Sequence, residues 1–264
     1  MMKKFLFVAV AVVFLASCKG KNAVPDQTLL NTRWLLETIG EEKIDNTNEN
    51  RPMYIFMEDG SYQLTGFAGC NGFSGSYLVG GNDELRFIGA RPQLLRTKWL
   101  LEAIGEEKIE NADKERAIYI ELTKTDEGNR VAGMAGCNRY FGEFTESGDS
   151  LTLGKMGSTR MMCDKMETET KYLNALNEVD GYKVDGMYMY FMSKGNVVLT
   201  YKVAEESLQF AVASTMMACD KLEIEGKFHQ ALGEVRKYDV EGLNLYLLDA
   251  SGKRVLGFNA FYEE

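Results

Sequence analysis

Short runs of alternating apolar and polar residues recur along most of this chain. Clear examples lie at residues 54–57, 117–122 and 186–191, and turn-forming pairs such as Asp59-Gly60 and Glu127-Gly128 separate the runs. A period of two residues sends successive side chains to opposite faces of a strand, so these runs predict β-hairpins with one buried face. The chain is therefore expected to be mainly β.

Two segments replace this alternation with a helical period. The first follows Asp164 and Glu167, and the second follows Asp220 and Glu223. A cap-forming residue with glutamate three positions later is typical of a capping box, so each pair predicts a helix start. The apolar-face positions are Tyr172, Leu173, Leu176 and Val179 in the first segment and Phe228, His229, Leu232 and Val235 in the second.

One pattern is written twice in this chain, and the second copy lies inside the first. Residues 32–44 return as residues 97–109 with eleven of thirteen positions identical, and residues 66–71 return as residues 133–138. The next shared motif, Ser-Thr followed by methionine and Cys-Asp-Lys, directly follows the second copy but reappears only near the chain end. The order of front half, complete unit and back half is typical of one domain inserted into a loop of another.

This order predicts an outer domain of residues 29–93 and 205–264, interrupted by an inner domain of residues 94–204. Each domain would be mainly β with one helix, and about eight strands predict a small closed or nearly closed barrel. In the outer domain, residues 85–88 and 208–211 both resemble the strand before the third motif. We expect residues 208–211 to fill that place, and residues 85–88 to leave as an edge strand or linker.

Residues 1–17 have the pattern of a secretory signal peptide, with two lysines before an apolar run too short to span a bilayer. The run ends in Leu15-Ala16-Ser17-Cys18, which resembles the lipobox of bacterial lipoproteins, where the cysteine is lipidated. An ordinary signal peptide with an incidental cysteine is the alternative. Residues 19–28 are polar and predict a tether from the lipid on Cys18, with a reach of roughly 17 Å.

The charge balance narrows the choice of partner. The net charge is −9, and removal of residues 1–17 leaves 28 basic against 39 acidic side chains, or −11. An acidic protein is not expected to bind nucleic acid, so the predicted membrane contact is the lipid anchor. Lys19 stands where an aspartate is associated with inner-membrane retention, so we expect the outer membrane, facing the periplasm.

Four cysteines follow the lipobox, two in each copy of the repeat. An even count in an exported protein predicts disulfides, with three possible connectivities. Matching positions in the two copies select Cys137 with Cys163 and Cys70 with Cys219. A metal centre would need a denser cluster than two cysteines per domain and one histidine in the chain, so we expect neither metal nor cofactor.

These motifs resemble the META domain, the HslJ-like family of bacterial envelope and stress-associated proteins. The residues that carry the resemblance are Trp99 and Leu101, the Gly-x-Ala-Gly-Cys-Asn-Arg-Tyr-x-Gly at 133–142 and the Ser-Thr-Arg-Met-Met-Cys at 158–163. The resemblance covers the whole inner domain and both pieces of the outer one. It implies a lipocalin-like β-barrel with an accessory helix, and no established catalytic chemistry.

The candidate ligand-binding residues are Arg139, Arg160 and Asn138. Gly72 and Met216 replace the two arginines in the outer domain, whereas scaffold residues occur in both copies. Two guanidinium groups beside the paired cysteines could bind a carboxylate or phosphate, whereas salt bridges to neighbouring Asp or Glu side chains are the more common use of such arginines. Both copies carry the asparagine beside a paired cysteine, as Asn71 and Asn138, so a structural turn is the favoured alternative for Asn138.

His229, the single histidine of the chain, aligns with Leu173 on the apolar face of the helix, so we expect it to be packed rather than catalytic. The methionines of the Met-rich strands are likewise expected to fill the core rather than to form a metal or peptide site, namely Met156, Met161, Met162, Met187, Met189 and Met192.

The resulting hypothesis is a non-enzymatic, lipid-anchored envelope protein with a binding or envelope stress and maintenance role. Its partner would be an envelope protein or a small anionic ligand. A small-ligand carrier with a hollow barrel and a hydrolase with converging carboxylates are the alternatives. A packed interior would favour a module that acts through its surface.

Overall fold

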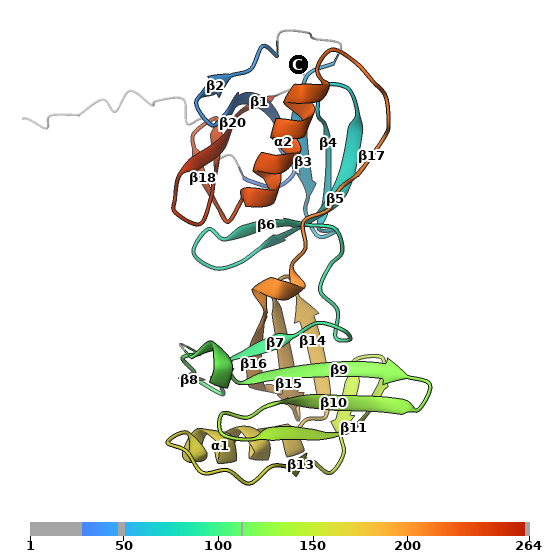
Figure 1. Ribbon diagram of the computed structural model, residues 1–264, viewed down its shortest axis with the longest axis vertical. Coiled ribbons are helices and arrows are strands. Elements are labelled where there is room, and N and C mark those ends of the chain that lie inside the picture. The colour runs from blue at the N-terminus through green and yellow to red at the C-terminus, as the bar shows by residue number, and fades with distance from the viewer. Residues whose placement is uncertain (1–27, 47–50, 112, 262–264) are drawn as a thin grey trace, which may run out of the picture.

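The computed structural model describes residues 28–46, 51–111 and 113–261, which form two antiparallel β-barrels, each with one helix (Figure 1). Cys18, the signal peptide and most of the tether lie outside the described residues. Mainly β architecture with one helix per barrel confirms the predicted fold class.

The outer barrel is built from both ends of the described chain. Its front half contains β1 (Arg33–Ile39), β2 (Glu42–Lys43), β3 (Tyr54–Glu58), β4 (Gln63–Phe67), β5 (Gly72–Val79) and β6 (Leu85–Ile88). Its back half contains β17 (Ala213–Ser214), α2 (Leu222–Glu234), β18 (Lys237–Glu241), β19 (Asn244–Leu248) and β20 (Arg254–Phe261). The halves join where β1 pairs with β20, and the strand order is β17-β5-β4-β3-β1-β20-β19-β18.

The inner barrel uses consecutive residues only. Its strands are β7 (Trp99–Ile104), β8 (Glu107–Lys108), β9 (Tyr119–Thr125), β10 (Gly128–Met134), β11 (Arg139–Ser147), β12 (Ser150–Leu153), β13 (Gly157–Ser158), β14 (Gly181–Asp185), β15 (Tyr188–Ser193) and β16 (Asn196–Val203). Its helix is α1 (Met166–Asn177), and short 3-10 turns lie at Lys114–Arg116 and Glu205–Ser207. Pairing of β10 with both β9 and β11 closes this barrel.

The strand at residues 85–88 differs from our prediction. β6 pairs with β5 and all four of its residues are buried, whereas residues 208–211 form no strand. A short turn after β5 brings β6 back at once, so its apolar side chains reach the core at little loop-closure cost. Residues 208–211 only run beside its end, where the Gly89 N–H donates to the Gln209 carbonyl at 3.0 Å.

The capping boxes were also predicted wrongly. The N-cap residues are Lys165 and Lys221, and neither helix has a side-chain cap hydrogen bond. The cysteine before each helix contacts its N-cap residue instead, because Cys163 and Cys219 accept weak bonds through Sγ from the Lys165 and Lys221 N–H groups.

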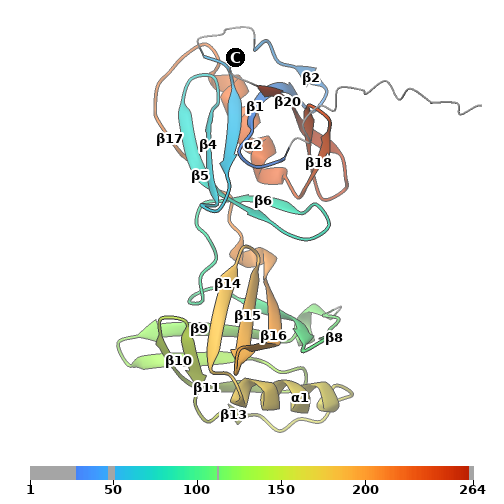
Figure 2. The same cartoon turned by 180° about the vertical axis from the view of Figure 1, so that it is seen from behind.

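The two barrels are stacked (Figure 2), and side chains of the two make contact at their junction. Leu78 and Ile88 of the outer strands belong to the core cluster of the inner barrel. Ion pairs rim this contact, with Lys202 Nζ 2.7 Å from Glu84 and Arg86 2.6 Å from Glu205. The junction is therefore both apolar and charged.

Candidate functional site

A buried asparagine ties together the segments around the inner disulfide. Asn138 is 2% exposed, and its Nδ2 donates to the Met161 carbonyl and to Glu169 Oε1 at 2.9 and 2.7 Å. Its Oδ1 accepts from Thr159 Oγ1 and from the Met161 N–H at 2.8 and 2.6 Å. Both amide hydrogens and both oxygen lone pairs are thus used within the protein. Asn138 is a scaffold residue, which does not support the predicted ligand contact.

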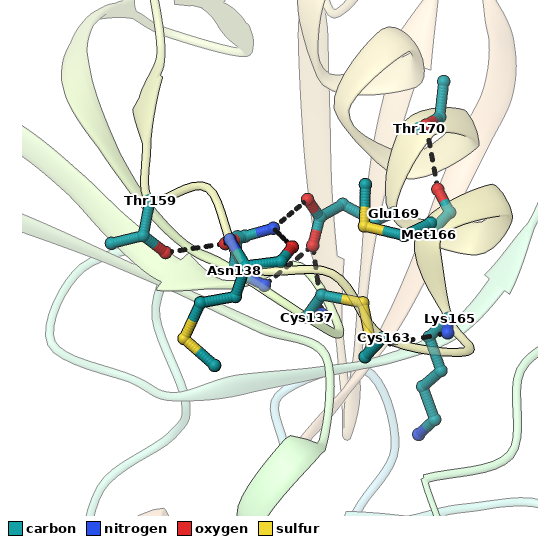
Figure 3. The surroundings of a disulfide bond; sticks show 9 residues. Cys137, Asn138, Thr159, Cys163, Lys165, Met166, Glu169 and Thr170 are labelled. Carbon is teal, nitrogen blue, oxygen red and sulfur yellow. Dashed lines mark hydrogen bonds between the residues drawn. A yellow bond between two sulfur atoms is a disulfide. The ribbon is translucent and has the colours of Figure 1, made fainter.

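Glu169, on the first turns of α1, completes this hydrogen-bond network of Asn138, Thr159 and Met161, which we call the knot (Figure 3). Glu169 is 4% exposed, and its Oε2 accepts from the backbone N–H groups of Cys137 and Asn138 at 3.0 and 2.7 Å. Gly136, at φ 118°, turns the chain directly before these two donors, in a conformation that other residues rarely adopt. The hydrogen bonds replace the hydration that the buried carboxylate loses.

The outer barrel repeats the arrangement with the equivalent residues. Asn71 donates to Glu225 and to the Met217 carbonyl, and it accepts from Thr215 and the Met217 N–H. The disulfides join Cys137 to Cys163 and Cys70 to Cys219, as predicted from the repeat. Sequence reasoning found the cysteines and asparagines but missed Glu169 and Glu225. Their matching positions in the two helices were the available signal.

Arg139 and Arg160 lie on either side of this knot. Arg160 stands between Thr159 and Met161, which both bond to Asn138, and the Thr159 N–H donates to the Arg139 carbonyl at 3.0 Å. Both arginine side chains are exposed. Within the described ranges neither takes part in an ion pair, so the structural explanation by salt bridging is not supported there.

A second difference between the copies lies inside the barrels. The hydroxyls of Tyr140, Tyr172 and Tyr201 form a buried chain, with oxygen separations of 2.8 and 3.1 Å. Burial raises the pKa of all three hydroxyls well above their usual range. The corresponding outer residues are Phe73, Phe228 and Phe258, whose rings lie at nearly the same spacings.

Side chains fill both barrel interiors. Trp34 and Trp99, aligned in the repeat, are 0% exposed, and the largest fully buried side chains are mostly aromatic. The grooves formed by described residues open to solvent instead. One of them, between β4, β5 and residues 207–213, has a volume of about 860 Å³. This packing does not support the hollow-barrel carrier.

His229 is half-buried, as predicted, with its ring 5.2 Å from that of Phe73 in an edge-on contact. Burial lowers the pKa of its imidazole. Its Nε2 is buried without a hydrogen-bond partner among the described residues. The His229 side chain therefore packs against Phe73 and does not line an open site.

Comparison with known families fits the nested order of the sheets. The META domain matches residues 27–90, 92–206 and 196–260, so the middle match spans the inner barrel and the others span the two pieces of the outer one. The chain belongs to the META domain family. No curated protein matches it.

The similarity to solved structures is more distant. A protein from Burkholderia xenovorans, determined by NMR, is 28% identical over 42% of this chain and 84% of its own, with a TM-score of 0.37. A DUF4847 family protein from Bacteroides vulgatus is 14% identical over 44% of this chain and 96% of its own, with a TM-score of 0.30. In this META protein, no helix of the described residues is long and apolar enough to cross a membrane.

Proposed function

We propose that this protein is a non-enzymatic binding module of the cell envelope, and that Arg139 and Arg160 of the inner META unit recognise an anionic group. The observation that carries the proposal is a pair of exposed guanidinium groups without ion-pair partners among the described residues, beside a fully bonded knot. Such groups bind carboxylate or phosphate through charged hydrogen bonds.

The comparison within the chain supports these two positions. Both copies keep the asparagine, the glutamate and the disulfide, which a duplicated scaffold needs twice. Only the inner copy carries the arginines, whereas Gly72 and Met216 occupy the outer positions. A ligand bound once by the molecule needs its contacts in one copy only.

The proposed cellular location is the outer membrane, with the protein facing the periplasm and anchored by a lipid on Cys18. The lipobox-like Leu15-Ala16-Ser17-Cys18 supports the anchor. The two disulfides support an oxidising compartment. The filled barrel interiors favour a surface-acting module over the carrier and the hydrolase.

The test replaces Arg160 with the residue of the outer copy. In the chain from residue 19 onward, Arg160→Met is expected to weaken binding of inorganic phosphate or acetate, followed by NMR shifts of the arginine side chains. The loss should be about 1.5–3 kcal/mol if a charged hydrogen bond disappears. The melting temperature should stay nearly unchanged, because the side chain is exposed.

Met216→Arg is the matched control, since it adds the same charge at the equivalent outer position without an arginine at residue 72. It should restore little binding to the Arg160→Met chain. A fall of several kcal/mol in unfolding free energy for Arg160→Met, with unchanged phosphate and acetate binding, would identify a structural arginine and refute the site.

A further inference from the structure

Two loops hold methionine side chains in solvent, so the expectation that Met161 and Met162 fill the core was wrong. Met161 and Met162 precede the inner Cys163 and are 62% and 91% exposed; Met216 and Met217 precede the outer Cys219 and are 99% and 51% exposed. These loops lie at opposite ends of the molecule, between β13 and α1 and between β17 and α2 (Figure 1). Four core methionines are instead 0% exposed, namely Met53, Met57, Met187 and Met189.

The backbone holds each loop in place. The Met161 N–H and carbonyl both bond to Asn138, and those of Met217 bond in the same way to Asn71. A disulfide follows each loop within two residues. The thioethers can therefore change chemically without loss of the bonds that fix the loops.

Each copy has two adjacent methionines in this loop, but only one methionine of each pair aligns with a methionine of the other copy. Met161 aligns with Met217, whereas Met162 aligns with Ala218 and Met216 aligns with Arg160. Both loops thus keep two adjacent thioethers where the copies otherwise differ. These four thioethers lie outside both packed cores, so reagents in solvent can reach them.

We infer that Met161, Met162, Met216 and Met217 are sites of reversible oxidation by hydroperoxides or hypochlorous acid. With a hydroperoxide, the sulfur lone pair attacks the terminal oxygen and the O–O bond breaks; its electron pair leaves on the other oxygen, which takes up the hydroxyl proton and departs as water or alcohol. With hypochlorous acid, sulfur attacks the chlorine and releases hydroxide, and water then displaces chloride from sulfur and loses its two protons to give the sulfoxide. The methionine is oxidised by two electrons and the oxidant is reduced by two.

The fold accommodates the product at these positions. A sulfoxide is polar, and at an exposed loop it stays hydrated, so it carries no burial penalty. At Met187 or Met189 the same oxygen would be forced into the packed inner core. Oxidation would turn the loop surface beside Arg160 from apolar to polar while the barrels stay folded.

Peroxide titration of the chain from residue 19 onward, with both disulfides intact, tests this. Peptide mass mapping should show sulfoxide at the four loop methionines at least tenfold faster than at Met53, Met57, Met187 and Met189. The melting temperature should remain unchanged after the loops are fully oxidised. Treatment with both stereospecific methionine sulfoxide reductases should then return the loops to the thioether.

Two controls make the outcome decisive. The Met161→Leu/Met162→Leu chain should take up two fewer oxygen atoms in the fast phase and keep its melting temperature. Unfolding in denaturant should make all methionines react alike. Equal rates in the folded chain, unfolding in step with loop oxidation, or sulfoxides that the reductases cannot remove would overturn the inference.

Discussion

At the residue scale, the asparagine and glutamate of each knot are expected to contribute more to the stability of the barrels than the exposed groups around them. The repeat identified Asn138 and Asn71 as scaffold candidates, because duplicated folds preserve structural residues. Glu169 escaped prediction because a glutamate on an amphipathic helix normally faces water. Its position three residues before the buried Tyr172 was the local hint.

We expect Glu169→Gln to destabilise the inner barrel by about 2–3 kcal/mol, because the amide would set a donor against at least one of the three donors around Oε1 and Oε2. Urea unfolding monitored by inner-barrel NMR resonances would measure this change. Glu167→Gln is the control, since that side chain is 85% exposed and its loss should stay within about 0.5 kcal/mol. Equal effects would mean that burial of Glu169 contributes nothing specific.

At the element scale, periodicity predicted the strands and helices. It did not predict which outer strands, before and after the insertion, correspond to β12 and β13 of the inner barrel. The inner barrel uses a single stretch for β12 and β13, whereas the outer barrel takes β6 from before the insertion and β17 from after it. Residues 85–88 and 208–211 have similar patterns, so sequence alone could not assign them. The short connection from β5 decided in favour of β6.

The tyrosine chain gives the inner barrel its own response to alkali. Burial raises the folded pKa of Tyr140, Tyr172 and Tyr201 above the usual 10, so their contribution is fully present below pH 10 and is lost as pH rises through the folded values. Stability measured between pH 9 and about 11.5 should therefore fall for the inner barrel. The outer barrel should fall less, because only Tyr77 among its described tyrosines with a raised pKa is fully buried, with a pKa of about 12, while Tyr62 and Tyr238 are partly exposed.

The check on this assignment copies the outer barrel into the inner one. The Tyr140→Phe/Tyr172→Phe/Tyr201→Phe chain should lose most of the alkaline decline of the inner barrel, followed by denaturant titration at each pH. An unchanged decline would place its cause in other groups.

At the scale of the whole molecule, the fold class followed from the repeat and from alternation. The contact between the barrels did not, because nothing in the pattern distinguishes Leu78 and Ile88 from residues of their own barrel. In the structure both side chains are at most 1% exposed and belong to the inner core cluster.

Residues 94–204 alone, oxidised, are therefore expected to fold with the Cys137–Cys163 bridge but to unfold more easily than in the full chain. The missing cover of Leu78 and Ile88 should cost about 1–3 kcal/mol, from the apolar area returned to water. Chemical denaturation of both proteins, monitored at Trp99, would measure the difference once Trp34 is changed to Phe in the full chain. Identical stability would show that the junction contributes nothing to the inner barrel.

The nested disulfides have a consequence for the time course of synthesis. The cysteines leave a ribosome or translocation channel in the order 70, 137, 163, 219, and the partner of Cys70 comes last, 149 residues later. Cys137 and Cys163 are only 26 residues apart and can close while the outer barrel is still half made. An oxidase that joins cysteines as they emerge would first link Cys70 to Cys137, a wrong pair. Correct pairing in this chain thus requires that the Cys70 thiol stay reduced until Cys219 has emerged, or that an isomerase correct the first bond.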